Sequence, residues 1–568
     1  MIKKEHFLLF LILIIGFSLR FYKLAKVPAG FLNDEAAIGY NAYSLIKTGR
    51  DEFGESWPLF FRSFGEGKLT LLVYEALLPV FVFGLSEFSV RFMPAFLGFL
   101  TVFLLYFLTK ELLEQVKKKK FSEQEKGTIS LLAAFSLAVL PWHLHFSRAA
   151  LNPESLFWVV FGTWLFLRGI RKKKLSLLVL SFVSFTASQL IYHAARVFAP
   201  PWAAVLISLS WHKMKKIKRL KLVLLYFVFI IVPAIVILKS PIAGARTTGI
   251  SLFHHQAGVQ IKLNEAITEC KNKPFLLVRG LHNKVEAYLR DFGQRYFAHF
   301  NFDFLFFDGD PLRPRYRVPN VGQMLLIQAP FFLVGLYLIF HYRLWLVLAW
   351  LFLAPLPAAI TFETPSSVRA IFMTIPLTIC SGLGFFWLVS QINFKNRIIK
   401  IFLYSFLFIL FFWNFSYYLD AYYFHQEVHQ PYYWQYGYKE LVVRVNKLLP
   451  HYNKAVITDS RGTPYIFFLF YNQYPPEKFQ AQVWQAFEPA KSFSFVAIRK
   501  LDNLEFVANK CPAKNGQEPG ILYVCTEEDH PQKEIKEGKV RIIDKINYQD
   551  GQPAFVLMEW VKEDEGSQ

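Results

Sequence analysis

Long apolar stretches separated by short basic runs dominate this sequence and restrict what it can fold into. Hydrophobic residues make up 54% of the 568 positions, and charged residues only 18%. A helix needs about 20 mainly apolar residues to cross a hydrocarbon core of roughly 30 Å, and such stretches recur over the first three quarters of the chain. The pattern predicts an all-α polytopic membrane protein and excludes a disordered chain, collagen and an ordinary cytosolic enzyme.

We expect about eleven transmembrane helices. The first apolar run follows Lys3 and Lys4 as in a signal peptide, but no small-residue cleavage pattern follows it, so we expect an uncleaved helix. The other ten are expected to start near Ser89, Gly127, Pro153, Leu175, Ala194, Leu220, Val321, Tyr342, Val368 and Ile398.

The basic residues orient these helices. Lys and Arg gather in the loops 115–126, 171–174, 213–221 and 395–400. Positively charged loops remain in the cytoplasm, and these four loops share one side only if the apolar stretch from Leu69 to Leu85 does not cross the membrane. Because Glu75 and Pro79 interrupt that stretch, we expect an amphipathic or half-buried helix in the outer interface. The N-terminus is then cytoplasmic.

This topology divides the chain into two predicted domains. Residues 1–418 form the transmembrane domain, with extracytoplasmic loops at about 22–88 and 240–320. Residues 419–568 form an extracytoplasmic domain, which is long enough for a core of its own.

The pattern of residues 419–568 is mixed α/β. It predicts an amphipathic helix over Tyr438 to Leu449, a short strand over Lys454 to Thr458, and two strands within Val540 to Trp560 joined through Asp550-Gly551. Cys511 and Cys525 lie in this region, and the sequence leaves open whether an oxidising compartment bridges them.

The net charge of +21 raises the question of nucleic-acid binding. Because the basic runs lie next to membrane-spanning stretches, their expected partners are lipid headgroups, and no nucleic-acid partner is expected. Four cysteines in 568 residues also exclude a disulfide scaffold and an iron–sulfur or zinc framework.

An acidic pair, Asp34-Glu35, follows the first predicted helix and begins a helix-like stretch with Asn33 as its cap. Acidic residues in a first helical turn often only stabilise that helix. A carboxylate at this place is also suited to take a proton from a substrate hydroxyl group. Both readings stay open on the residues alone.

The motifs of the first 200 residues resemble those of a known family. Asp34-Glu35 is followed about 30 residues later by Gly67-Lys68 and then by a Glu-Phe-Ser-Val-Arg phrase, Glu87 to Arg91. With the first helix, this order resembles the GT-C membrane glycosyltransferases, specifically the dolichyl-phosphate-mannose protein mannosyltransferases and their bacterial aminoarabinose-transferase-like relatives. Further matches are Ser147 to Ser155 and Tyr192 to Arg196. Relatives often have Lys-Pro-Pro where this chain has Lys68-Leu69-Thr70.

The resemblance covers the architecture of about residues 1–418 and implies an activity. It implies transfer of mannose, another hexose or a pentose from a polyprenyl-phosphate donor to a protein, lipid or glycan acceptor, outside the cytoplasm at the plasma membrane. Asp34 is the expected general base. Glu35 points about 100° away from Asp34 on the helix, so it is expected to orient the sugar or to brace the loop. One base and a phosphate leaving group predict inversion at the anomeric carbon.

The same reaction requires cations near the departing phosphate. Lys68 is the first candidate, followed by Arg91, Arg148 and Arg196, whose alternative role is headgroup anchoring or pairing with a carboxylate.

Tyr192 and His143 are the candidates for contact with the acceptor or the sugar. Glu363 and Arg369 either line a cavity or pair with each other.

No cofactor is expected to be required, although a divalent cation is possible. Asp308-Gly309-Asp310 fits a D-x-D pattern that holds divalent metals, and the same residues are typical of a turn. Asp308 and Asp310 are therefore weak metal candidates, and no metal site is predicted.

Two other functions compete with an enzyme. A secondary transporter or lipid flippase places its ionisable residues near the bilayer midplane, whereas the notable acids and bases of this chain lie in its predicted outer loops. A membrane scaffold would tolerate substitution of Asp34, Glu35 and Lys68.

Overall fold

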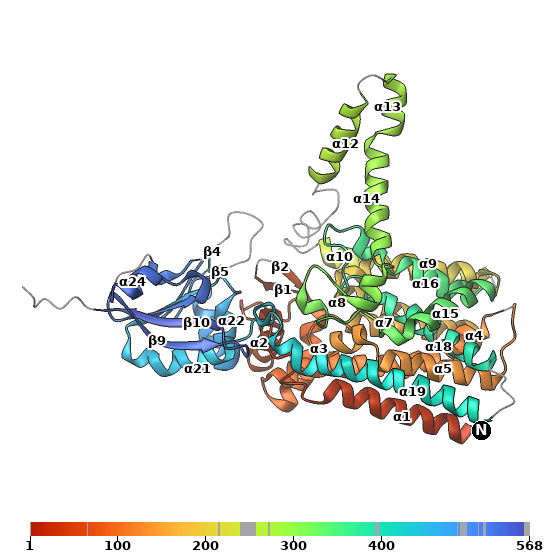
Figure 1. Ribbon diagram of the computed structural model, residues 1–568, viewed down its shortest axis with the longest axis horizontal. Helices are drawn as coiled ribbons and strands as arrows, with labels where there is room; N and C mark the ends of the chain where they lie inside the picture. The colour runs from red at the N-terminus through yellow and green to blue at the C-terminus, as the bar shows by residue number, and fades with distance from the viewer. Residues whose placement is uncertain are drawn as a thin grey trace, which may run out of the picture. The chain divides into compact units, whose positions relative to one another are not determined.

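The computed structural model of this chain is mainly helical, with a small sheet near the C-terminus (Figure 1). It describes residues 2–64, 66–116, 118–213, 216–238, 257–270, 273–391, 397–484, 487–488, 497–508, 510–514 and 518–561. The chain forms two compact units. The helical unit contains residues 1–22 and 94–421, and the mixed unit contains residues 23–93 and 422–568.

Long apolar helices build the helical unit. They are α1 (Ile2–Phe21), α4 (Glu87–Glu114, which begins in the mixed unit), α5 (Glu123–Ala138), α7 (Glu154–Lys172), α8 (Leu175–Ile191), α9 (His193–Ser210), α10 (Lys216–Leu238), α15 (Ala329–His341), α16 (Trp345–Leu353), α18 (Thr374–Gln391) and α19 (Arg397–Asp420). Short helices α6 (Pro141–Phe146) and α17 (Leu356–Ala359) connect some of them. Most of these helices start within a few residues of the predicted positions.

Within the described residues, three helical stretches are long and apolar enough to span a membrane. They are Glu87–Glu114, Ile371–Gln391 and Arg397–Val428. Shorter apolar helices cover Leu71–Phe83, Leu175–Ile191, Leu326–His341 and Trp345–Ala359. The expectation of about eleven spanning helices therefore stays a prediction.

Two glycines let α15 and α18 approach closely. A Cβ atom on Gly335 would lie 1.8 Å from the carbonyl oxygen of Cys380, and one on Gly384 would lie 1.9 Å from that of Phe331. Small residues at helix crossings are typical of membrane bundles, where close backbone packing replaces the hydrophobic effect as a source of helix association.

A projecting arm interrupts the helical unit between α10 and α15. It comprises α12 (Ala257–Glu269), α13 (Phe275–Leu281) and α14 (Lys284–Ala298) (Figure 1). Residues 239–256, the first part of the predicted outer loop 240–320, lie outside the described residues.

The mixed unit begins with α2 (Asn33–Thr48), the hairpin of β1 (Phe60–Ser63) and β2 (Glu66–Leu69), and α3 (Thr70–Phe83). Helix α3 matches the expected Leu69 to Leu85 helix and contains Pro79. Its position in the outer interface stays a prediction.

A six-stranded sheet forms the rest of the mixed unit, in the order β6-β7-β3-β8-β10-β9. The strands are β3 (Lys454–Thr458), β6 (Lys500–Leu501), β7 (Leu504–Val507), β8 (Ile521–Thr526), β9 (Val540–Asn547) and β10 (Pro553–Trp560), with a separate pair β4 (Phe487–Glu488) and β5 (Ala497–Ile498). β3 runs parallel to β7 and β8, and the other pairs are antiparallel. The helices are α21 (Tyr438–Leu448), α22 (Pro464–Tyr471), α23 (Pro476–Gln482) and α24 (Gln532–Lys536). The predicted α21, β3, β9 and β10 are thus confirmed.

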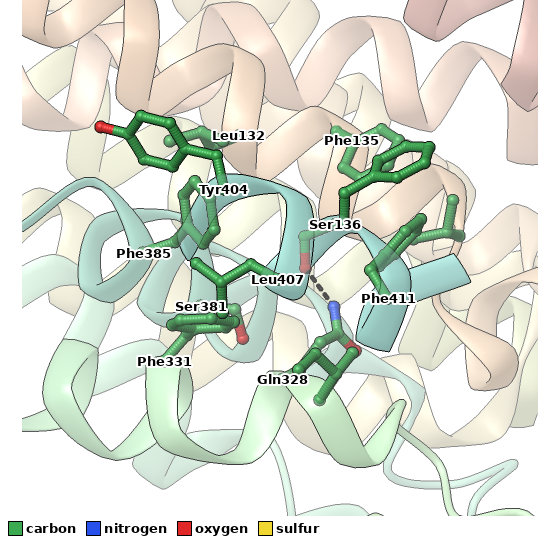
Figure 2. Close-up of a pocket in the computed structure, with 14 residues that line it drawn as sticks. Leu132, Phe135, Ser136, Gln328, Phe331, Ser381, Phe385, Tyr404, Leu407 and Phe411 are labelled. Atoms are coloured by element: carbon green, nitrogen blue, oxygen red, sulfur yellow. Dashed lines mark hydrogen bonds between the residues drawn. The ribbon is translucent and has the colours of Figure 1, made fainter. Parts of the chain in front are cut away.

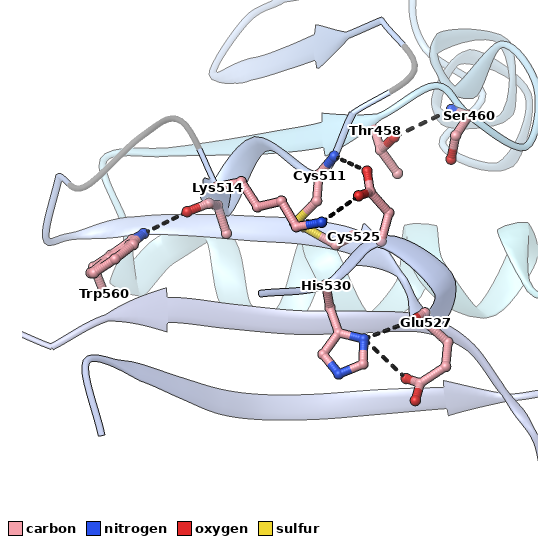
Figure 3. The surroundings of a disulfide bond; sticks show 10 residues. Thr458, Ser460, Cys511, Lys514, Cys525, Glu527, His530 and Trp560 are labelled. Atoms are coloured by element: carbon pink, nitrogen blue, oxygen red, sulfur yellow. Dashed lines mark hydrogen bonds and ion pairs between the residues drawn. A yellow bond between two sulfur atoms is a disulfide. The ribbon is translucent and has the colours of Figure 1, made fainter. Parts of the chain in front are cut away.

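A disulfide joins Cys511 to Cys525, whose Cα atoms lie 4.8 Å apart (Figure 3). Both cysteines are fully buried on one face of the sheet, in a cluster with Val456, Tyr523 and Val556. Asp529 accepts hydrogen bonds from the Cys511 backbone N–H and from Lys514 Nζ, which fixes the short segment after Cys511. The bridge that the sequence left open is present in the structure.

The first loop and the C-terminal region fold into the same compact unit, although the sequence predicts a boundary at 418/419 between two domains. Helix α2 explains this arrangement, because it is buried along most of its length. Tyr40 Oη donates a hydrogen bond to the Tyr474 carbonyl oxygen at 2.9 Å. Gln480 Nε2 donates to Ser44 Oγ and to the Asp51 carbonyl oxygen, at 3.1 and 2.9 Å. Helix α2 is therefore a core element shared by both segments of the unit.

Candidate functional site

The N-terminus of α2 presents the two predicted catalytic carboxylates differently. Asp34 is half-buried, and its backbone N–H donates to Asn33 Oδ1 at 2.9 Å. Glu35 is fully buried, and its Oε2 accepts a hydrogen bond from the Leu32 backbone N–H at 3.1 Å, which caps the helix. The first turn of a helix also favours negative charge. Asp34 is therefore the more accessible of the two acids.

Glu35 forms a buried ion pair with Arg91 on α4. Arg91 Nε donates to Glu35 Oε1 at 2.9 Å, and a terminal nitrogen of Arg91 donates to Oε2 at 3.1 Å. The other N–H groups of Arg91 donate to the carbonyl oxygens of Leu24, Pro28 and Gly30. The pair ties the chain before α2 to the start of α4, so Glu35 braces the loop, which is one of its two predicted roles.

The same contacts change the reading of Arg91. All five of its N–H groups are engaged by protein oxygens, and the side chain is fully buried. A direct bond to a donor phosphate would require Arg91 to give up one of these contacts. In the structure, Arg91 holds the chain before α2 to the start of α4, and its guanidinium group is not free to bind a ligand.

The C-terminal segment holds the residue before Asp34. Gln435 Oε1 accepts a hydrogen bond from the Asn33 backbone N–H at 2.6 Å, and Asn33 Nδ2 donates to Thr463 Oγ1 at 3.0 Å. Gln435 in turn donates through Nε2 to the Arg461 carbonyl oxygen at 3.2 Å. The position of Asp34 is thus set by side chains about 400 residues further along the chain, and sequence reasoning missed Gln435 because no local pattern marks it.

Lys68 lies on β2, where its backbone pairs with Phe61. Its side chain lies outside what the structure describes, so its predicted contact with phosphate stays a prediction.

In the helical unit, Arg148 closes the C-terminal end of α1. It donates to the carbonyl oxygens of Leu19, Arg20 and Tyr22 at 2.7, 3.0 and 2.7 Å. The last carbonyl groups of a helix lack hydrogen-bond donors within that helix. The fully buried side chain of Arg148 provides those donors. These partners are backbone carbonyl oxygens, whereas the alternative reading expected headgroup anchoring or pairing with a carboxylate, so both predicted roles of Arg148 stay predictions.

His143 on α6 is also fully buried. Its Nδ1 lies 2.8 Å from a terminal nitrogen of Arg20, and because arginine only donates, Nδ1 is the acceptor and the proton is on Nε2. Arg20 also donates to the Ala138 carbonyl oxygen at 3.2 Å. His143 therefore lies in a buried polar contact between α1 and α6, away from any exposed surface.

Tyr192 and Arg196 lie at the junction of α8 and α9. Tyr192 has an extended backbone, with φ −143° and ψ 139°, which separates the two helices. Arg196 Nε donates across this junction to the Gln189 carbonyl oxygen at 3.2 Å. Both side chains are half-buried, so a contact with substrate stays a prediction for both.

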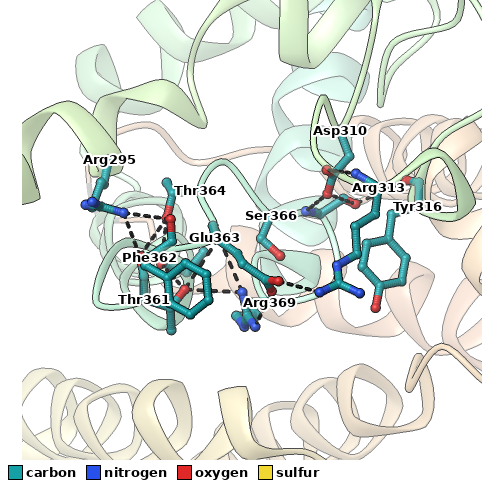
Figure 4. Close-up of polar contacts among 12 residues, drawn as sticks. Arg295, Asp310, Arg313, Tyr316, Thr361, Phe362, Glu363, Thr364, Ser366 and Arg369 are labelled. Atoms are coloured by element: carbon teal, nitrogen blue, oxygen red, sulfur yellow. Dashed lines mark hydrogen bonds and ion pairs between the residues drawn. The ribbon is translucent and has the colours of Figure 1, made fainter. Parts of the chain in front are cut away.

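Two loops of the helical unit meet through Asp310 (Figure 4). Asp310 Oδ2 accepts hydrogen bonds from the backbone N–H and the hydroxyl group of Ser367, both at 2.8 Å. Its Oδ1 accepts from the backbone N–H groups of Leu312 and Arg313 at 3.0 and 3.3 Å. Burial raises the pKa of Asp310 above its ordinary value, against the lowering effect of these bonds.

These contacts bear on the weak metal candidates. Asp310 is engaged and buried, whereas Asp308 is exposed. Among the residues that the structure describes, no group of three or more His, Cys, Asp or Glu side chains is arranged to hold a metal ion.

Glu363 pairs with two arginines in the same region (Figure 4). A terminal nitrogen of Arg369 lies 2.8 Å from Glu363 Oε2, and Arg313 contacts Oε1. Burial would raise the pKa of Glu363, but the bond from Arg313 and the charge of Arg369 outweigh it and hold that pKa below its ordinary value. Two cations share one carboxylate, so the group carries excess positive charge. Arg313 was not identified from the sequence as a partner of Glu363, although the alternating arginines of residues 313–317 mark a concentration of positive charge there.

An apolar cavity of about 340 Å³ lies among helices of the helical unit (Figure 2). Gln328 Nε2 donates to Ser136 Oγ at 2.7 Å at its edge, so these polar groups are satisfied. Its lining is contributed mainly by α5, α15, α18 and α19: Leu132, Phe135, Ser136, Val139, Ile327, Gln328, Phe331, Ser381, Gly382, Phe385, Tyr404, Leu407, Phe408 and Phe411.

Comparison with known proteins identifies one family model that matches part of the chain and solved structures with a similar fold. Residues 73–237 match the family described as dolichyl-phosphate-mannose-protein mannosyltransferase. The chain has the fold of ArnT from Cupriavidus metallidurans, solved bound to undecaprenyl phosphate, with 11% identity, a TM-score of 0.50 and coverage of 96% of this chain and 97% of that one. No curated protein sequence matches the chain.

The archaeal oligosaccharyltransferase AglB from Archaeoglobus fulgidus, solved with an inhibitory peptide and a dolichol-phosphate, is similar at 13% identity and a TM-score of 0.47. That match covers 82% of this chain, which spans 63% of the length of AglB. The family match and the ArnT fold confirm the predicted resemblance to the GT-C membrane glycosyltransferases.

Proposed function

We propose that this protein is a glycosyltransferase of the plasma membrane that moves a sugar from a polyprenyl-phosphate donor to a protein, lipid or glycan acceptor outside the cytoplasm. The observation that carries the proposal is the match of residues 73–237 to the mannosyltransferase family. The fold shared with ArnT, whose structure holds undecaprenyl phosphate, supports the polyprenyl-phosphate donor. Mannose, another hexose and a pentose are all compatible with it.

Asp34 is the general base of this proposal. The acceptor oxygen attacks the anomeric carbon, its proton passes to the Asp34 carboxylate, and the bond from that carbon to the phosphate oxygen breaks. Asp34 suits this role because it is half-exposed at a helix N-terminus, whereas Glu35 is buried against Arg91. A single displacement of this kind inverts the anomeric configuration.

The leaving polyprenyl phosphate is already an anion, so it needs cations rather than a general acid. Lys68, in the same unit as Asp34, is the proposed contact. Arg91 and Arg148 act through the backbone segments that they hold. No resident metal is required in this scheme.

The lipid part of the donor requires an apolar environment. The cavity among α5, α15, α18 and α19 is lined mainly by aromatic and aliphatic side chains, which suits a segment of hydrocarbon chain. The excess of Lys and Arg in loops 115–126 and 213–221 supports a cytoplasmic N-terminus and an outward-facing site.

The test is transfer of radiolabelled sugar from a panel of synthetic polyprenyl-phosphate sugars to membrane acceptors, with purified protein in liposomes. Asp34→Asn should lose transfer while it still binds the donor. Glu55→Gln is the matched control, because Glu55 is an exposed acid of the same unit that pairs with Arg62, and it should retain transfer. Equal activity of wild type and Asp34→Asn would remove Asp34 from the chemistry, and no turnover with any donor would contradict the function.

A further inference from the structure

The arm formed by α12, α13 and α14 exposes more apolar surface than a water-facing loop normally does. Its tip and one side of α14 carry the arm's apolar face, which consists of Phe275 (70% exposed), Leu276 (84%), Leu277 (50%), Leu281 (59%), Val285 (68%) and Leu289 (65%). Contiguous apolar patches of this kind mark contact with a membrane or a protein.

Helix α14 is amphipathic, with an apolar side and an opposite side that faces α12. Val285, Leu289 and Phe292 recur at helical spacing along one side. The opposite side, with Ala287, Arg290 and Gln294, faces α12 across a cavity of about 420 Å³. No residue of α14 is fully buried, so the apolar side is not covered by the described part of the chain.

The base of the arm is fixed to the bundle. Arg295 donates to the carbonyl oxygens of Thr361 and Phe362 at 3.1 and 2.8 Å, and Tyr296 Oη donates to the Phe352 carbonyl oxygen at 2.8 Å. From this base α14 runs crosswise to α5 and α19 of the same unit (Figure 1). If α5 and α19 cross the bilayer, a helix crosswise to them runs parallel to the membrane plane, and its contacts with Thr361 and Phe362 place its base at the predicted outer end of the bundle.

The charge around the tip matches a lipid surface. Residues 273–285 include Lys273, Arg279 and Lys284 and contain no Asp or Glu, and all three cations are exposed. Arg279 lies over the ring of Phe275, at 5.6 Å from its centroid. Apolar residues interleaved with basic ones are the composition of helices that lie in a membrane interface and attract anionic headgroups.

We propose that the arm lies on the outer leaflet of the membrane, with its apolar face among the acyl chains and Lys273, Arg279 and Lys284 at anionic headgroups. The partner is the lipid surface rather than a second copy of the chain or another protein. The proposal requires the membrane embedding of the bundle and does not depend on the sugar-transfer activity.

The test uses the full chain in nanodiscs of equal parts phosphatidylcholine and phosphatidylglycerol, one protein molecule per disc. Cys270→Ser and Cys380→Ser remove the two free thiols. The fluorophore NBD is attached to Leu276→Cys on the apolar face or to Gln294→Cys on the opposite side of α14. Lipids with a nitroxide on the acyl chain should quench NBD at position 276 at least roughly twofold more than at position 294.

Equal quenching at the two positions would overturn the proposal, because the apolar face would then not enter the acyl-chain region. The charges are tested separately with Arg279→Glu combined with Lys284→Glu, which should reduce quenching at position 276. Unchanged quenching in that variant would contradict the headgroup contact. The labelling substitutions and the charge substitutions all alter exposed side chains. A single symmetric peak in size-exclusion chromatography checks that each variant is folded.

Discussion

Gln435 accepts a hydrogen bond through Oε1 from the backbone N–H of Asn33 at 2.6 Å, although the two residues are 402 positions apart. Asn33 precedes the proposed base Asp34, and its side chain is also held by Thr463. The C-terminal region is thereby part of the support of the proposed catalytic helix. This gives that region a structural reason to be present in a membrane enzyme.

Replacement of Gln435 should therefore slow sugar transfer. Gln435→Ala removes a hydrogen bond of about 1 kcal/mol, which corresponds to a roughly fivefold lower rate if it acts on the position of Asp34. Gln435→Glu retains the acceptor oxygen but loses the Nε2 donation to the Arg461 carbonyl oxygen, so it should retain more activity than Gln435→Ala. Measurement of kcat and donor KM checks this, with Asn446→Ala as an exposed control on α21. A rise in donor KM with kcat unchanged would contradict positioning of the base.

The buried pair of Glu35 and Arg91 should be costly to break from either side. Removal of one partner leaves an unpaired charge in the interior, so Glu35→Ala and Arg91→Ala should each destabilise the mixed unit by about 3–5 kcal/mol. The double variant should lose less than the sum of the two, because neither charge is then left alone. Thermal unfolding in detergent gives the three values, and strict additivity would show that the two side chains do not interact.

Loss of the Cys511–Cys525 bridge should destabilise the C-terminal sheet. The bridge closes a loop with a sequence separation of 14, for which chain entropy predicts about 3 kcal/mol. The double replacement Cys511→Ser and Cys525→Ser should lower the unfolding midpoint, and reducing agent should lower that of the wild type equally. Cys270→Ser with Cys380→Ser serves as the control. An unchanged midpoint in the presence of reducing agent would contradict a stabilising bridge.

Asp51 should make stability depend on pH. Burial raises the pKa of this carboxyl from its ordinary value of 3.8 to about 6, against the lowering effect of the N–H bonds from Glu55 and Phe53. The folded state then holds a proton that the unfolded state releases between about pH 4 and pH 6. Its contribution is fully present below pH 4 and is lost as pH rises through 6, by up to about 3 kcal/mol. Asp51→Asn should remove this slope when unfolding is measured from pH 4 to 7, and an unchanged slope would assign it to another group.

Sugar transfer should survive treatment with EDTA. The departing group is a phosphate that needs only fixed cations, and Asp310 is already engaged by Ser367, Leu312 and Arg313. Asp308→Asn should likewise be active. A loss of activity in EDTA that Mg²⁺ or Mn²⁺ restores would contradict the metal-free mechanism.

The sequence predicts local elements well where one pattern dominates. Strand-like apolar segments on both sides of Asp550-Gly551 predict β9 and β10, and helical spacing predicts α21, within a residue or so. The helix expected near Val321 instead begins at Ala329, because the backbone of residues 318–325 bonds elsewhere: Val318 bridges Val321, and the Gln323 N–H donates to the Phe304 carbonyl oxygen.

The site was harder to predict, since its contacts join distant segments. Asp34 and Glu35 stand out by their charge next to an apolar helix, but nothing local indicates that Arg91 pairs with Glu35 or that Gln435 holds Asn33. Arg148 shows the same limit: its residue type suits a phosphate ligand, whereas its three carbonyl partners lie in the last turn of α1 and at Tyr22 just after it. The partner of a buried polar group is decided by the tertiary fold.

Residues 23–93 and 422–568 form one compact unit, so its folding cannot finish until the C-terminal segment has been synthesised. Helix α2 leaves the ribosome early, but Gln435 follows Asn33 by 402 positions, a delay of about 20–80 s at usual elongation rates. During that time the helix carrying Asp34 can pack on α3 and pair with Arg91, but it lacks the contacts that residues 422–568 supply. A chain that stops early would lack Gln435 and never complete this support, so the proposed base Asp34 reaches its final position only in molecules that include the C-terminal segment.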